Sequence, residues 1–194
     1  MKTSNTQAIF AYWDCLRGAR SAPERGEIEP GAVRHALLDT FILENGTDGL
    51  IVRLAGTRLC ALFGGELKDR AFTSLWPDAP TRVELSRMID AVMDECAGAI
   101  TGLAVQTASG KVADLELLVL PLRHGGKTHA RVLGALTPVE VPQWLGFESI
   151  IKVDVRSMRI IWPSGLPRPQ ATPPAGPTER RARFTLVAGG RAQA

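Results

Sequence analysis

Apolar residues recur along the chain with the helical period of three to four in two stretches. The first covers residues 5–20, where Gly18 can end the helix. The second is the clearest helix signal in the chain, and its apolar side is formed by Leu85, Met88, Ile89, Val92, Met93 and Cys96. Thr81 and Glu84 have the spacing of a capping box, so we expect this second helix to begin at Thr81.

Between and after these helices the pattern is that of strands. Runs at 40–44 and 50–54 flank turn residues and predict a hairpin. Three further β-rich runs, at 99–107, 112–122 and 129–136, are joined by short turns containing glycine, which makes them antiparallel. We therefore expect an α+β fold in which helices cover one face of a five-stranded antiparallel sheet and enclose a cavity.

The C-terminal third has a different character. The stretch at 150–162 is β-rich and adds either another strand or a return helix. Residues 163–177 hold six prolines and should form an extended linker. The expected organisation is an N-terminal helix and loop over 1–30, a sheet domain with a β-rich extension over 31–162, and a flexible, Pro-rich basic tail over 163–194.

Composition and charge change this organisation little. The chain has 194 residues, 45% of them hydrophobic and 22% charged, which fits a single folded domain and excludes disorder of the whole chain. The net charge of +3 arises in the tail, because from Pro163 onward five Arg and one Glu give +4, which leaves −1 for the rest. The charge therefore does not favour nucleic-acid binding, which would use only the tail.

The cysteines do not indicate a metal site or a disulfide framework. Cys15, Cys60 and Cys96 stand far apart, without metal-ligand spacing and in odd number. No apolar run reaches the ~18 residues that span a bilayer, and no secretory signal is evident at the N-terminus. We expect a cytoplasmic protein without a metal ion or membrane contact.

Four segments of the sequence carry a more specific likeness. They are YWDCLRGARSAPERGEIEPGAV (12–33), RLAGTRLCALFGGEL (53–67), FTSLW (72–76) and HARVLGALTP (129–138). Together they resemble a family of small, stand-alone PAS-domain proteins of alphaproteobacteria. Asp69 departs from the family, which usually has Gly at that turn. The resemblance implies a PAS core that acts in signal sensing or protein–protein interaction, and no enzymatic activity.

The resemblance also bears on cofactors. Haem-binding PAS domains commonly ligate iron through a His of the long helix, and this helix has none. Flavin-type light sensors need a Cys in the short helix that corresponds to residues 69–75, which also has none. We therefore expect neither haem nor flavin, and an unidentified small-molecule ligand stays open.

The residues expected to line the cavity are mostly apolar, and their alternative role is simply the core. They are Leu54, Arg58, Phe63, Phe72, Trp76, Met88, Val92, Cys96, Leu117 and Leu133. Arg58 is the candidate anchor for an acidic ligand, with an exposed helix position as the alternative. Cys96 would end the long helix beside the cavity, where helical spacing favours a buried, unreactive thiol.

The N-terminal helix is the candidate partner interface. Ile9, Phe10, Trp13 and Leu16 form its apolar stripe. If that stripe does not pack on its own sheet, it would invite a partner helix or a second copy of the chain. Trp13→Asp would then lower the oligomeric state in light scattering.

Catalytic arrangements are not evident. The conceivable nucleophile–base pairs are Cys15 with His35 and Cys60 with His129, and nothing in the local sequence orients either pair. Asp114 and Glu116 alternate with apolar residues, as on a solvated sheet face. We predict a non-enzymatic signalling module that binds a partner protein, as a homodimer or with another chain, under regulation by a small molecule. The alternatives are a metabolite-binding domain without signalling output and weak nucleic-acid binding through the tail.

Overall fold

The computed structural model describes residues 1–46 and 49–163, and it contains one six-stranded antiparallel sheet in the order β2-β1-β5-β4-β3-β6. The strands are β1 (Thr40–Gly46), β2 (Gly49–Ala55), β3 (Gly98–Thr107), β4 (Val112–His124), β5 (Lys127–Pro138) and β6 (Ile150–Ile161). The α-helices are α1 (Ser4–Arg17), α2 (Thr57–Phe63) and α3 (Ala79–Glu95). Short 3-10 helices are η1 (Arg25–Glu27), η2 (Pro30–Val33), η3 (Leu37–Asp39) and η4 (Phe72–Leu75).

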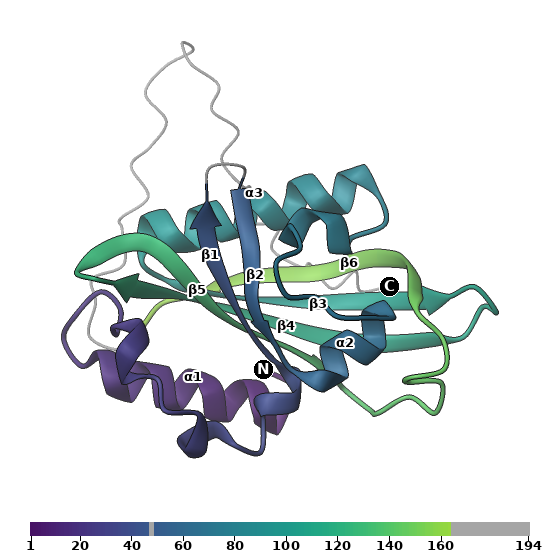
Figure 1. Ribbon diagram of the computed structural model, residues 1–194, viewed down its shortest axis with the longest axis horizontal. Coiled ribbons are helices and arrows are strands. Elements are labelled where there is room, and N and C mark those ends of the chain that lie inside the picture. Colours follow the sequence, from purple (N-terminus) through teal and green to yellow (C-terminus); the bar gives the residue numbers. More distant parts are fainter. Residues whose placement is uncertain (47–48, 164–194) are drawn as a thin grey trace, which may run out of the picture.

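The α+β fold expected from the sequence is confirmed, with two additions. Figure 1 shows the sheet between α1 on one side and α3 on the other, so helices cover both faces and not one. The β-rich stretch at 150–162 becomes β6, which pairs with β3 along its length and makes the sheet six-stranded. That ladder is interrupted by register shifts between Gly102 and Leu103 and between Gln106 and Thr107. The predicted tail lies outside the described residues from position 164 onward.

The inner face of the sheet, which we define as the face toward α2, η4 and α3, carries the larger core. Leu103, Leu117 and Val119 point into it from the central strands, and Leu85 and Ile89 meet them from α3. α3 begins earlier than predicted, because Asp78 is its N-cap and accepts a hydrogen bond from the Thr81 backbone N–H at 2.8 Å. A carboxylate at this end suits the helix dipole.

The outer face of the sheet is covered by α1, which corrects the partner-interface prediction. Ile9 and Trp13 are buried against the strands, and Phe10 and Leu16 are partly buried beside them. The Trp13 indole Nε1–H donates to the Pro121 carbonyl oxygen at 2.8 Å. The apolar stripe of α1 therefore packs on its own sheet, and Trp13→Asp would disrupt the fold and not report self-association. Residues 1–30 also share this core with the strands, so no domain boundary lies at residue 30.

Glu116 is a buried carboxylate on the outer face, 4% exposed, and not part of a solvated face as its alternation with apolar residues indicated. It accepts hydrogen bonds from the backbone N–H groups of Lys2 (2.6 Å) and Thr3 (3.0 Å) and from the Thr6 hydroxyl (2.5 Å). Desolvation is the largest single influence on its pKa and raises it, but these hydrogen bonds together outweigh it and lower the pKa of Glu116. The carboxylate thus holds the start of α1 on the sheet.

Across the described residues no helix has the length and apolar character needed to cross a bilayer.

We expect Glu116→Gln to lower the free energy of unfolding by about 2 kcal/mol at neutral pH, because the amide loses charge-assisted hydrogen bonds. Since the folded-state pKa is lowered, the stabilisation is complete above the unfolded-state pKa of about 4.3 and is lost as pH falls through the folded-state value. Urea unfolding should show the difference between wild type and variant shrinking under acid. Asp114→Asn, an exposed position on the same strand, is the control, and an equal loss there would contradict the assignment.

Candidate functional site

A small internal cavity lies between the inner face of the sheet and the segment from α2 to η4. Every side chain around it is apolar: Phe41, Val52, Ala55, Leu59, Phe63, Leu67, Phe72, Leu75, Trp76, Leu117 and Leu136. The cavity volume is about 10 Å³. That is room for about one water molecule, which would find no polar partner there. In this state the cavity is closed to any larger ligand.

Four aromatic rings pack together on the inner face of the sheet. Phe41 stacks on Phe72 with centroids 5.8 Å apart, and Phe72 meets Trp76 edge-on at 5.4 Å. Phe63 approaches Trp76 edge-on at 5.5 Å and is partly buried, whereas the other three rings are buried. The Phe63 ring is therefore the part of the aromatic cluster that reaches the surface.

Gly134 on β5 makes this cluster fit against the sheet. A Cβ atom there would lie 2.0 Å from Cζ of Phe41, so the ring occupies the place of a side chain. Gly134 pairs with Phe41 on β1, which fixes the ring over the glycine. The strand register thus sets the floor of the cavity.

Four predicted lining residues surround the cavity: Phe63, Phe72, Trp76 and Leu117. Met88 and Val92 belong to the same core but lie on α3, away from the cavity wall. The Met88 sulfur accepts a hydrogen bond from the buried Thr101 hydroxyl at 3.0 Å. Cys96 does not line the cavity either, because it is the half-buried C-cap of α3 with a left-handed backbone.

The prediction that Leu54 and Leu133 line the cavity is wrong. Both lie opposite Ile42 in the sheet, one on each side of β1, and so share its outer face. Leu133 is buried under α1, and Leu54 on the edge strand is 42% exposed. Because neighbouring residues of a strand point to opposite faces, an error of one position in register moves a side chain to the wrong core.

The prediction that Arg58 anchors an acidic ligand in the cavity is also wrong, because its guanidinium points away from the cavity. Its Nη1 lies 2.7 and 2.8 Å from the two carboxylate oxygens of Asp39, which is fully buried in η3. The Asn5 side-chain amide of α1 donates to the same carboxylate at 2.7 Å. Arg58 therefore serves an internal ion pair, and no charged group lines the cavity wall.

The lining residues absent from the sequence prediction are Phe41, Val52, Ala55, Leu59, Leu67, Leu75 and Leu136. Phe41, Val52 and Leu136 lie on β1, β2 and β5, whose hydrophobic runs do not show which face of the sheet a residue occupies. Among the lining side chains, Trp76 has the one buried polar atom without a partner, its indole Nε1–H. The surface that faces the cavity is entirely apolar, so the site suits an apolar group.

The lining does not fit a flavin. The four rings leave no room for a tricyclic ring system, and no Cys or charged side chain lies on the wall. Within residues 1–46 and 49–163, no three His, Cys, Asp or Glu side chains come together as metal ligands would.

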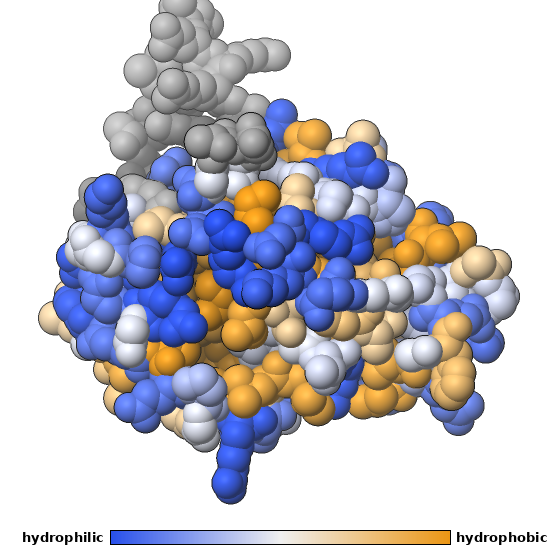
Figure 2. Space-filling model, viewed as in Figure 1, coloured by the Kyte–Doolittle hydropathy of each residue, from blue (hydrophilic) through white to orange (hydrophobic). Residues whose placement is uncertain are grey.

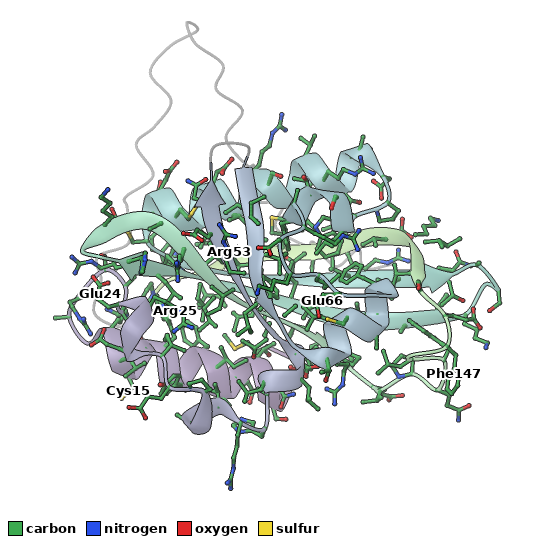
Figure 3. The ribbon with its side chains drawn as sticks, viewed as in Figure 1. Cys15, Glu24, Arg25, Arg53, Glu66 and Phe147 are labelled. Atoms are coloured by element: carbon green, nitrogen blue, oxygen red, sulfur yellow. The ribbon has the colours of Figure 1, made fainter. Side chains whose placement is uncertain are left out.

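Charged side chains instead gather on the surface. Figure 2 shows a hydrophilic patch in the middle of the visible face, where Figure 3 places Arg53. Arg53 pairs with Asp69 at 2.8 Å and also with Glu44, which Arg131 approaches at 3.3 Å. Asp69 has the left-handed backbone that a family glycine would adopt, with φ of 64°, so the turn tolerates the substitution.

Comparison with known proteins identifies the family. Residues 1–137 match the PAS_5 family, described as a PAS domain. The match runs from α1 into β5 and covers most of the chain, so this chain belongs to the PAS-domain family. β6, which follows the match, completes the sheet.

Two solved structures are similar to parts of the chain. One is a light-oxygen-voltage domain studied with a flavin analogue, with 17% identity and a TM-score of 0.43, covering 60% of this chain and 86% of that one. The other is VqmA bound to DPO, with 12% identity and a TM-score of 0.42, covering 58% of this chain and 56% of that one. None of the curated proteins matches the chain.

We expect Gly134→Ala to destabilise the fold by about 1–3 kcal/mol, because the new methyl group must displace the Phe41 ring. Urea unfolding measures the loss, and near-ultraviolet circular dichroism reports the disturbed aromatic cluster. Gly65→Ala is the matched control, since a Cβ there meets nothing within 4 Å. Equal stability of the two variants would show that the cluster does not depend on Gly134.

Proposed function

We propose that this protein is a PAS-type sensory and signalling module that acts through protein–protein interaction and is regulated by a small, largely apolar ligand. The observation that carries the proposal is the enclosed aromatic cavity on the inner face of the sheet of a PAS domain. An apolar wall is suited to recognising a small apolar molecule. The protein has no catalytic activity of its own in this proposal, and its location in the cytoplasm stays a prediction.

Ligand binding requires the cavity to open. Because the free volume is about that of one water molecule, a ligand must displace at least one ring. Phe63 is the ring with a route to the surface. Binding then selects an open conformation that the free protein populates only in part, and the difference between the two conformations is the signal.

We expect protein purified from its native cells to carry a small molecule that native mass spectrometry detects. Ala55→Phe should abolish this bound mass, because the added ring fills the cavity from the end of β2. Val83→Phe, at an exposed position of α3, is the control and should keep the bound mass. The same mass on both variants, or none on the wild type, would contradict a ligand in this cavity.

Partner binding needs a surface other than the stripe of α1. Phe147 is the most exposed of the large apolar residues described, at 88%, and Figure 3 places it at the end of the molecule in the loop before β6. Its neighbour Glu148 accepts hydrogen bonds from the Lys111 ammonium (2.7 Å) and the Ser109 hydroxyl (2.6 Å). These contacts lower the pKa of Glu148 to about 2, Lys111 contributing most. On the other side, Trp144 is buried in the inner core.

The loop thus presents an aromatic ring on a fixed support. Exposed aromatic residues are typical anchors of protein interfaces, because a ring with two side-chain torsions buries a large apolar area at a low entropic cost. We propose that Phe147 inserts into an apolar pocket of the partner protein.

We expect Phe147→Ser to leave the free energy of unfolding within about 0.5 kcal/mol of wild type, because the ring makes few internal contacts. The same change should weaken capture of the partner in cross-linking experiments by more than about tenfold, the effect of losing a hot-spot side chain. Val83→Ser, an exposed apolar position on α3, serves as the comparison. Undiminished capture by Phe147→Ser would exclude this loop.

A further inference from the structure

Asp39 stands between the helices that cover opposite faces of the sheet. Its carboxylate, fully buried at the entry to β1, binds Arg58 of α2 on the inner side and Asn5 of α1 on the outer side. In Figure 1, α1 and α2 approach each other where β1 begins. One side chain therefore connects the two helical layers around the sheet.

The connection to α2 is stiff. Gly56, which precedes α2, donates its backbone N–H to the Thr40 carbonyl oxygen at 2.8 Å. A Cβ on Gly56 would lie 2.2 Å from the Leu37 carbonyl oxygen and 2.3 Å from that of Leu38, so α2 begins in direct contact with the backbone of η3. Because packed elements move as units, a displacement of α2 carries η3 and its Asp39 with it.

The other side of α2 is a wall of the cavity. Leu59 and Phe63 line it, while Arg58 points to Asp39. The seven-residue helix Thr57–Phe63 thus touches the aromatic cluster with one side and the buried carboxylate with the other. Any ligand that displaces Phe63 acts on the helix that holds Arg58.

We propose that Asp39 is a positioning residue that transmits displacement of α2 to the first turn of α1. This inference rests on the proposed sensory function, because it describes how occupation of the cavity reaches the outer face of the sheet. Breaking one side of a buried charged cluster leaves the remaining charge poorly compensated, so the two contacts of Asp39 are expected to depend on each other. When α2 shifts, Asn5 loses its acceptor and the start of α1 loosens.

The test is a double-mutant cycle read by native-state hydrogen exchange of the full chain. Phe63→Ala disturbs α2 from the cavity side and needs no ligand. It should speed exchange of the α1 amides that follow Asn5 by about fivefold or more, beyond any change in global stability measured by urea unfolding. Asn5→Ala removes only the outer contact of Asp39, and in that background Phe63→Ala should have no further effect on α1.

One further variant and one further measurement extend the cycle. Gln7→Ala is the matched control, because Gln7 is exposed in the same helix and its side chain bonds the Met1 carbonyl oxygen, not Asp39. In the Gln7→Ala background, Phe63→Ala should still speed exchange of the α1 amides. Asn5→Ala, which removes the outer contact of Asp39, should in turn speed exchange of the α2 amides.

An equal response of α1 with and without Asn5, or no response in the wild-type background, would overturn the proposal. Failure of the sensory function gives a different result. In that case the cycle shows coupling but native protein carries no small molecule, whereas a bound molecule without coupling leaves the function intact and rejects the role of Asp39.

Discussion

The central strands β4 and β5 carry apolar side chains toward both faces of the sheet, and this two-sided burial governs the rest of the structure. Leu117 and Val119 point inward, while Leu118 and Leu120 point outward. A sheet of this kind is stable only when both faces are covered. The α2–α3 region covers one face and α1 the other, so the N-terminal helix is part of the domain and its apolar stripe is not free for a partner.

Covering the outer face brings polar groups into the interior, where they must be paired. Glu116 and Asp39 both lie at the N-terminal end of α1 and receive its amide and hydroxyl hydrogens. Two buried carboxylates at the positive end of a helix dipole are favourable, and each binds a particular backbone or side-chain donor. These carboxylates therefore fix where α1 sits, which apolar packing alone would leave adjustable.

The sequence predicted where the helices and strands lie better than it predicted which face of the sheet each residue occupies. The burial of Leu85 and Met88 follows from the helical period, and the family likeness of the four segments agrees with the PAS_5 match. The prediction that Leu133 lines the cavity was wrong, because the run around it is apolar at nearly every position and no alternation shows which face of the sheet it occupies. The roles of Arg58 and Glu116 depend on partners distant in sequence, which no local pattern contains. The continuous run Leu117–Leu120 was the available sign that α1 had a sheet face to cover.

β6 closes the sheet on the side of β3, but its ladder to β3 is broken twice by register shifts. Each shift bends the strand and disturbs the regular row of outward-facing backbone groups, and Lys152 and Arg156 place charges along it. Such an edge is a poor template for another strand. β6 thus extends the sheet to six strands with an edge that disfavours pairing with a strand of another chain.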